Sequence, residues 1–160
     1  MKFAILVGPS GAGKSTFAQQ FAGPGLVICS ADDYFLTEEG EYVFEPARLG
    51  EAHAACFRKA VEAVVAGKSV LIDNTNTTLV ELAPYIALSR AYGEDPYISV
   101  FRPSPKLTDA GTDAVLDFLM GRARHGAPRN RVAAQCRRLR ETLAQWPPLW
   151  PPFASAYFGD

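Results

Sequence analysis

A glycine-rich segment near the N-terminus constrains the fold more than any other feature of this sequence. It reads Gly-Pro-Ser-Gly-Ala-Gly-Lys-Ser-Thr over residues 8–16 and matches the pattern G-x-x-x-x-G-K-[ST] in full. The apolar run Lys2–Val7 before it is typical of a buried parallel strand, and Lys14–Phe21 after it is predicted to be a helix. An ordinary glycine-rich turn has no need of Lys-Ser-Thr at a helix start. The sequence therefore predicts a loop that binds the phosphates of a nucleoside triphosphate.

The residue types within this loop fit that role. Glycines at 8, 11 and 13 let the backbone approach phosphate groups with its N–H groups pointing inward. Lys14 is expected to reach the β- and γ-phosphates, and the Ser15 hydroxyl to hold Mg²⁺. The expected cofactors are therefore ATP or GTP and Mg²⁺. The predicted nucleotide-binding residues are Gly8, Ser10, Gly11, Ala12, Gly13, Lys14, Ser15 and Thr16.

Strand and helix patterns alternate along the rest of the chain. This alternation predicts an α/β fold of the P-loop NTPase or kinase type, a parallel sheet of four to five strands with helices on both faces. The further predicted strands are Leu26–Ser30, Ser69–Asp73 and Tyr97–Phe101. The further predicted helices are Ala47–Ala66, Leu79–Tyr92 with a kink at Pro84, Asp113–Arg124 and Arg129–Trp146.

The length of 160 residues fits one domain. We assign residues 1–145 to a P-loop kinase domain, in which residues 113–130 form a helical lid that carries arginines. Residues 146–160 are a tail rich in proline and aromatic residues, which we expect to pack its rings on the domain. A Pro-x-x-Pro match at Pro148–Pro151 could instead be a ligand for another module, which is the less favoured alternative.

Nothing in the sequence predicts an exported or membrane-bound protein. The first apolar run is too short for a signal peptide, and no stretch approaches the roughly 20 apolar residues of a membrane span. Cys29, Cys56 and Cys136 include no close pair, so neither a disulfide framework nor a zinc site is indicated. We therefore expect a cytoplasmic protein with no membrane partner.

Two acids follow the second predicted strand, in Ser30-Ala31-Asp32-Asp33-Tyr34-Phe35. Ligands of open α/β sheets bind outside the carboxyl ends of the strands, so these acids are expected to face the phosphate loop. A carboxylate there can accept a proton from an attacking hydroxyl or serve Mg²⁺ through water. The alternative is a helix cap, and the two roles are compatible if one acid caps and the other acts in catalysis.

The third predicted strand ends in Asp73-Asn74-Thr75-Asn76. Asp73 is expected to support Mg²⁺ through Ser15 or water. Asn74, Thr75 and Asn76 supply neutral groups that can bind an acceptor phosphate or hydroxyl. Ordinary turn chemistry is the alternative for these three residues.

Charge is segregated along the chain, although the formal net charge is only −1. Residues 32–51 hold seven acids against Arg48, and residues 122–140 hold seven arginines and no acid. Arginines in a lid neutralise charge on a transferring phosphoryl group and exclude water. Arg122 and Arg124, beside a Gly–Pro loop, are the candidates for this role. A solvated helix face explains some of the later arginines, Arg137, Arg138 and Arg140.

With these motifs in this order, residues 1–140 resemble the polynucleotide kinase-like P-loop phosphotransferases. The resemblance implies that Asp32 is the general base for a polynucleotide 5′-hydroxyl and that Arg122 or Arg124 is the lid arginine. It also implies an acceptor site lined by Asp33, Tyr34, Phe35, Asn74, Thr75 and Asn76. This group includes the phage 5′-polynucleotide kinase domain, and the chain departs from that domain at two of these positions, where Phe35 replaces an arginine and Asn74 replaces an acid.

These residues lead to the hypothesis of a kinase that phosphorylates 5′-hydroxyl ends of DNA or RNA and that serves a repair or ligation enzyme. Tyr34, Phe35, Tyr42 and Phe44 carry rings that can stack bases, although a core role for two of them is equally open. His53 is expected to be packed rather than to face the acceptor. One alternative, motivated by Phe35, is a kinase of a small molecule such as a nucleoside, nucleotide or modified base. Another is a nucleotide-gated binding module without transfer activity. The oligomeric state stays open.

Overall fold

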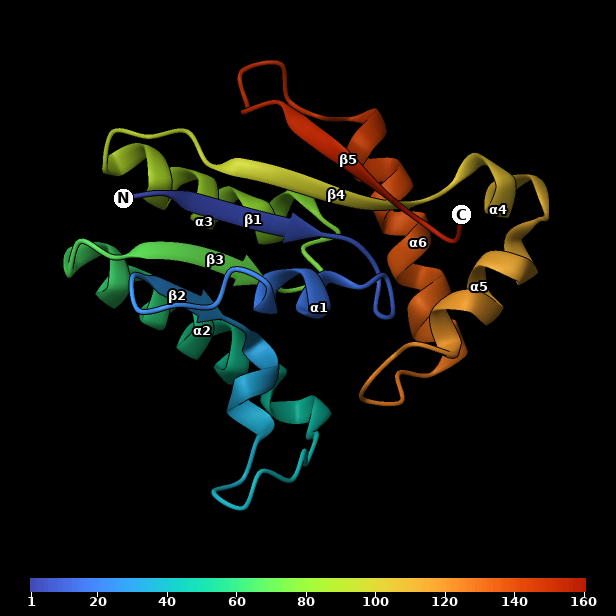
Figure 1. Ribbon diagram of the computed structural model, residues 1–160, viewed down its shortest axis with the longest axis horizontal. Helices are drawn as coiled ribbons and strands as arrows, with labels where there is room; N and C mark the ends of the chain where they lie inside the picture. The colour runs from blue at the N-terminus through green and yellow to red at the C-terminus, as the bar shows by residue number, and fades with distance from the viewer.

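Five parallel strands run through the centre of the molecule in the order β2-β3-β1-β4-β5 (Figure 1). The computed structural model describes residues 1–160. The strands are β1 (Phe3–Val7), β2 (Leu26–Cys29), β3 (Ser69–Asp73), β4 (Tyr97–Pro103) and β5 (Phe153–Phe158). The predicted α/β fold with a parallel sheet is thereby confirmed. Because β1 lies between β3 and β4, the loop that follows it emerges at the middle of the sheet's carboxyl edge.

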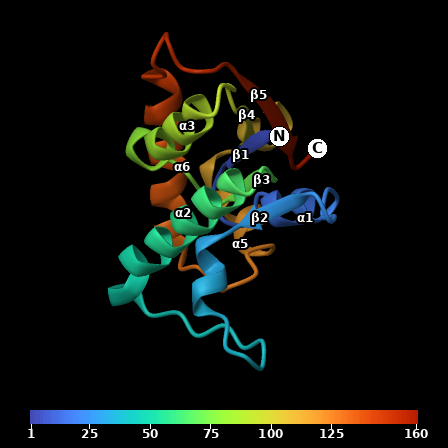
Figure 2. The same ribbon diagram turned by 90° about the vertical axis from the view of Figure 1, so that its left-hand side faces the viewer.

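The helices lie on both faces of this sheet. Figure 2 shows α2, α3 and α6 on one face and α1 on the other. The α-helices are α1 (Lys14–Gln19), α2 (Leu49–Val65), α3 (Leu79–Ala91), α4 (Pro105–Asp109), α5 (Thr112–Met120) and α6 (Arg129–Ala144). Two short 3₁₀ helices, η1 (Ala31–Phe35) and η2 (Pro46–Arg48), connect β2 to α2. No helix has both the length and the apolar character needed to cross a membrane.

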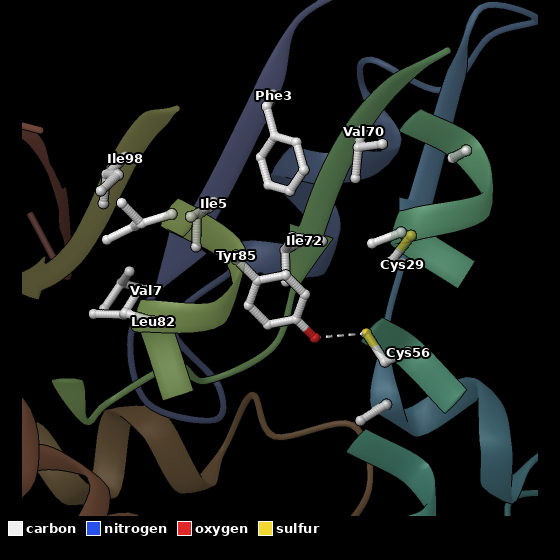
Figure 3. Packing of buried hydrophobic residues seen from close by; sticks show 14 of the residues in the cluster. Phe3, Ile5, Val7, Cys29, Cys56, Val70, Ile72, Leu82, Tyr85 and Ile98 are labelled. Carbon is white, nitrogen blue, oxygen red and sulfur yellow. Dashed lines mark hydrogen bonds between the residues drawn. The ribbon is translucent and has the colours of Figure 1, made fainter. Parts of the chain in front are cut away.

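Alternate residues of the strands enter two separate hydrophobic clusters, as the period of two in a strand requires. Figure 3 shows the cluster against α2 and α3, where Ile5 and Ile72 of the sheet meet Leu82 and Tyr85 of α3. In the same cluster the Tyr85 hydroxyl donates a hydrogen bond of 3.3 Å to Sγ of Cys56. The cluster on the other face combines Leu6 and Leu71 of the sheet with Ala18, Leu116, Leu119 and Val132 of α1, α5 and α6.

The C-terminal segment, residues 146–160, was expected to pack its rings on the domain, and it also contributes a strand to the sheet. Phe153–Phe158 pairs in parallel with β4 and is the edge strand of the sheet, which the sequence did not predict. Its residues Phe-Ala-Ser-Ala-Tyr-Phe include no β-branched side chain, so the strand pattern is weak. Trp146, Trp150 and Phe153 pack against the first cluster. Pro151 is buried, which removes one of the two prolines that a Pro-x-x-Pro ligand would present.

Most of the other predicted elements agree with the structure to within a few residues at each end. The largest difference is at α5, which ends at Met120, so that Arg122 and Arg124 lie in the following loop and not on the helix. The helix is cut short because Gly121 follows it and disfavours continuation. Neither η1 nor α4 was predicted, because each is only a turn or so long and has no apolar periodicity.

Candidate functional site

The loop between β1 and α1 is folded tightly against its neighbours. Gly11 has a φ of 84°, and a Cβ atom at this position would lie 2.1 Å from the carbonyl oxygen of Leu119. Gly8 donates a backbone hydrogen bond of 2.9 Å to Thr75 in the loop after β3. The backbone N–H of Ser10 donates a bond of 2.9 Å to Oε1 of Gln135 on α6. The conformation of the loop is therefore determined by contacts with β3, α5 and α6.

Lys14 folds back across this loop. Its side chain is buried, and Nζ donates hydrogen bonds of 2.9 Å and 2.8 Å to the carbonyl oxygens of Gly8 and Pro9. Burial lowers the pKa of Lys14 to about 8, although the carboxylates of Asp73 and Asp32 act in the opposite direction. A buried ammonium of this kind would be stabilised by the negative charge of phosphate groups.

Asp73 and Ser15 place oxygen atoms next to Lys14. Asp73 is buried at the end of β3, and this burial raises the pKa of its carboxyl, against the effects of the Ser15 hydroxyl and of Lys14. A carboxylate and a hydroxyl are oxygen ligands of the kind Mg²⁺ prefers, and a divalent cation would offset the cost of the buried charge. No group of three or more His, Cys, Asp or Glu side chains is placed to hold a metal by itself. Ser15 and Asp73 therefore fit an ion that takes its other ligands from phosphates and water.

Arg122 lies beside the phosphate loop. Its guanidinium packs over the ring of Phe118 at 5.2 Å, and its Nη2 lies 3.9 Å from where a Cβ of Gly13 would be. Together with Phe17 and Tyr157 these residues border a cleft of about 290 Å³. The structure thus brings Arg122 to the phosphate loop, whereas Arg124 does not line this cleft, although both side chains are exposed.

Asp32 is the acid that faces the open side of the site. Ser30 caps η1 by accepting a hydrogen bond of 3.3 Å from the Asp32 N–H, so neither acid is needed as the cap. The half-exposed carboxylate accepts a bond of 3.2 Å at Oδ1 from the Tyr42 hydroxyl. Burial and Asp32 raise the pKa of Tyr42 to about 12, so its hydroxyl keeps its proton. Nε2 of His125, from the loop after α5, lies 3.8 Å from Oδ2.

Asp33 points away from this open side. Its carboxylate forms an ion pair of 3.2 Å with Lys59 of α2, and Nζ of Lys59 also donates to the carbonyl oxygen of Ile28. Tyr34 likewise turns toward the start of α2, where its hydroxyl contacts Glu51 of α2 and Arg48 of η2. The neighbouring acids therefore differ in environment, because Asp33 is paired with Lys59, whereas Asp32 pairs with no lysine or arginine and has only His125 nearby.

Several other predicted acceptor residues form hydrogen bonds or packing contacts within the fold. Asn74 accepts a bond of 2.8 Å from the Ala31 N–H, and its amide donates to Sγ of Cys56 at 3.4 Å. Asn76 is buried with a φ of 48°, and it donates a bond of 2.8 Å to the Leu6 carbonyl. Phe35 is 5% exposed and belongs to the first hydrophobic cluster, so it is not available to stack a base. These side chains hold the ends of β1, β2 and β3 in place.

Four residues that the sequence did not assign to the site, or assigned only as stacking rings, form a surface beside Asp32. The rings of Tyr42 and Phe44 are 6.3 Å apart and nearly parallel, at 5°. His125 stacks on Tyr42 at 3.8 Å, and the guanidinium of Arg131 lies 4.8 Å from the centre of the Phe44 ring. Alternation in Glu41-Tyr42-Val43-Phe44-Glu45 was a signal for the two rings on one side. No sequence signal paired them with His125 or Arg131.

A second cleft, of about 720 Å³, lies apart from these acids. It is bounded by Pro9 of the phosphate loop and by residues of β4, α5 and α6, including Arg102, Arg137 and Arg140. None of the acids described above lines this cleft, so we do not assign the chemistry to it.

Comparison with solved structures bears on the fold. A chain in the structure of the Pnkp1/Rnl/Hen1 RNA repair complex is similar in fold, with a TM-score of 0.67 at 24% identity over 91% of this chain and 46% of that one. A gluconokinase from Sinorhizobium meliloti 1021 has a TM-score of 0.60 at 12% identity, over 99% of this chain and 83% of that one. The fold is therefore that of P-loop kinases.

Two sequence comparisons bear on the family. Human NEDD4-binding protein 2 is 43% identical over 91 residues, a match that covers 55% of this chain and 5% of the relative. The chain thus spans only a small part of that protein's length. A family model described as an AAA domain matches residues 3–145. Because this match covers most of the chain, the protein belongs to this AAA domain family and has the fold of a P-loop kinase.

Proposed function

We propose that the protein transfers the γ-phosphoryl group of ATP or GTP to the 5′-hydroxyl end of a nucleic acid. The position of Asp32 carries this proposal. Its carboxylate is near enough to the phosphate loop to oppose the fall in the pKa of Lys14 that burial causes, yet it is half exposed. An open carboxylate beside a phosphate-binding loop suits an acceptor hydroxyl that must lose its proton during phosphoryl transfer.

Each residue of the site has a role in this reaction. Lys14 and the loop amides would bind the donor phosphates, and Ser15 and Asp73 would hold Mg²⁺, which neutralises charge on the phosphate oxygens when bound. Asp32 accepts the proton of the 5′-hydroxyl while the oxygen of that hydroxyl forms a bond to the γ-phosphorus. The bond between that phosphorus and the β,γ-bridging oxygen breaks, and the nucleoside diphosphate leaves with the electron pair. Arg122 neutralises charge on the donor side.

The surface next to Asp32 supports a nucleic-acid acceptor. Tyr42 and Phe44 with His125 and Arg131 combine aromatic faces with positive charge, the combination that binds single strands by stacking and by phosphate contacts. The likeness in fold to a chain of an RNA repair complex is consistent with this choice. We accordingly propose a repair or ligation enzyme as the partner that uses the 5′-phosphate end.

A kinase of a small molecule is the second candidate. It is favoured by the internal hydrogen bonds of Asn74 and Asn76 and by the burial of Phe35. These residues are then not free to contact a nucleic-acid strand. Salt separates the two candidates. Binding through several phosphates weakens steeply as salt rises, whereas binding of a neutral nucleoside does not.

The test is transfer from ATP labelled at its γ-phosphate to a 5′-hydroxyl oligonucleotide, run beside nucleosides and gluconate. We expect labelled oligonucleotide, and Asp32→Asn should reduce transfer by about 10³-fold, within the range for loss of a general base, while ATP affinity is retained. Glu39→Gln removes an exposed acid with no ion pair in the nearby segment and is the matched control. Labelled nucleoside without labelled oligonucleotide would establish the second candidate. Tight ATP binding with no labelled acceptor would overturn both.

A further inference from the structure

The loop between α5 and α6, residues 121–128, touches both halves of the site. Arg122 borders the same cleft as Gly13 of the phosphate loop, with Nη2 3.9 Å from where a Cβ of Gly13 would be, and three residues later His125 lies beside Asp32 and Tyr42. In Figure 1 this loop projects toward the segment that joins η1 to α2. One short segment therefore connects the residues that bind the donor to the residues that surround the acid.

The contact at His125 is close but incomplete. The imidazole lies over the Tyr42 ring at 3.8 Å and 21°, which fixes the plane of the imidazole. Its Nε2 atom is 3.8 Å from Oδ2 of Asp32, which is longer than a hydrogen bond. The Tyr42 hydroxyl already bonds Oδ1 of the same carboxylate at 3.2 Å. The two oxygens of Asp32 thus face two different donors, of which only one is engaged.

We propose that His125 is a positioning residue that couples binding of the donor nucleotide to the orientation of Asp32. This inference rests on the proposed function. When donor phosphates bind Arg122, the loop is drawn toward Gly13, and Nε2 of His125 reaches hydrogen-bond distance of Oδ2. With both oxygens bonded, the carboxylate keeps one orientation, and its remaining lone pairs face the acceptor hydroxyl. Catalytic hydrogen bonds that are long in a free enzyme commonly tighten in this way.

The contact contributes little to the stability of the fold. The His125 and Asp32 side chains are 37% and 55% exposed, and exposed charged contacts of this kind seldom stabilise a protein measurably. Arg129, by contrast, joins α6 to α5 through Asp113 and Asp117 and holds the base of the loop. Replacement of His125 should therefore change the reaction without unfolding the lid.

The first test compares His125→Leu with His125→Gln. We expect His125→Leu to lower kcat by about tenfold, the loss of one hydrogen bond to a charged group, with the KM for ATP unchanged. His125→Gln should restore most of the rate, because its amide can donate to Oδ2 from a similar position. Asn130→Ala changes an exposed residue near the same loop and should leave both constants unchanged. Equal losses in the Leu and Gln variants would overturn the proposal.

The second test measures coupling by binding alone. A non-hydrolysable ATP analogue should tighten binding of a 5′-hydroxyl oligonucleotide to the wild-type protein by about fivefold, within the usual range of coupling between two sites. His125→Leu and Arg122→Gln should each abolish this tightening. In the double variant the analogue should likewise leave oligonucleotide affinity unchanged, with no further loss of affinity than in either single variant. Coupling that persists in His125→Leu would contradict the proposal.

The two tests separate this inference from the proposed function. If the oligonucleotide binds but is never phosphorylated, the proposed function fails, and the coupling measurement still decides the role of His125. If no oligonucleotide binds with or without the analogue, both proposals fail.

Discussion

The two halves of the site are built in different ways. The proposed donor half, made of residues 8–16 with Asp73 and Arg122, relies on backbone amides of one continuous loop and on the buried side chains of Lys14 and Asp73, beside which Arg122 is the exposed member. The acceptor half, made of Asp32, Tyr42, Phe44, His125 and Arg131, relies on half-buried or exposed side chains from three separate segments. The donor half therefore depends on the integrity of the sheet, whereas the acceptor half depends on the position of the lid loop, residues 121–128 between α5 and α6. Each prediction below tests this contrast.

The largest effect is expected for Lys14→Met. Loss of the ammonium should lower phosphoryl transfer by on the order of 10³-fold, because no other cation reaches the phosphates from within the loop. The same variant should be at least as stable as the wild type. The fall in the pKa of Lys14 from 10.5 to about 8 corresponds to a cost of roughly 3 kcal/mol for the buried charge at pH 7.

Thermal unfolding and ATP titration of Lys14→Met check both parts. A variant that binds no ATP but melts at an equal or higher temperature would agree with this expectation, in which the buried ammonium of Lys14 serves ATP binding at a cost in stability. A clear loss of stability would show instead that the bonds from Nζ to Gly8 and Pro9 outweigh the cost of burial.

Gly11→Ala tests whether the donor half is as rigid as its contacts indicate. The added Cβ would lie 2.1 Å from the carbonyl oxygen of Leu119, and φ at this position is 84°. We expect a loss of about 3 kcal/mol or more in the free energy of unfolding, from the left-handed backbone and the overpacking together. Gly50→Ala, with no atom within 4 Å, is the control and should stabilise α2 by roughly 0.5 kcal/mol. Denaturant unfolding of both variants measures the difference.

The same contrast explains how much could be predicted from the sequence. The phosphate loop, Lys14 and Asp73 were predictable because a contiguous motif and strand ends specify them. In the proposed acceptor half, the sequence predicted Asp32 and offered Tyr42 and Phe44 as stacking rings, but it gave no role to His125 or Arg131. Contacts such as Tyr42 with His125 join segments more than 80 residues apart, and no local pattern encodes them. Asn74 and Asn76 were expected to bind the acceptor. The sequence does not show that their side chains form hydrogen bonds with the backbone of Ala31 and of Leu6.

The affinity for ATP should depend on pH through Lys14. The pKa of Lys14 in the free protein is about 8, and bound phosphates favour the charged form and so raise this pKa. Above pH 8 the free protein loses this proton while the complex keeps it, so the dissociation constant should rise by up to about tenfold per pH unit. Below pH 8 Lys14 should contribute no pH dependence.

Calorimetric titration with ATP between pH 7 and 9.5 measures this effect, and Lys14→Met should lack it. Asp32 is the group of the acceptor half that raises the pKa of Lys14, so Asp32→Asn should lower this pKa and shift the onset of the pH dependence to lower pH. An unchanged onset would mean that the two halves are electrically independent.

Tyr42→Phe should have the smallest effect, and it probes the contrast from the acceptor side. The change removes the hydroxyl that donates to Oδ1 of Asp32 at 3.2 Å, while the ring that supports His125 stays. Because the bond lies at the surface, we expect kcat to fall by about threefold, with ATP affinity and melting temperature unchanged. Steady-state kinetics with an oligonucleotide acceptor measure it, and Tyr42→Leu, which also removes the support for His125, should be several-fold worse. If Tyr42→Phe were as damaging as Tyr42→Leu, the hydroxyl would outweigh the ring, and the orientation of Asp32 would depend on Tyr42 rather than on the position of the lid loop.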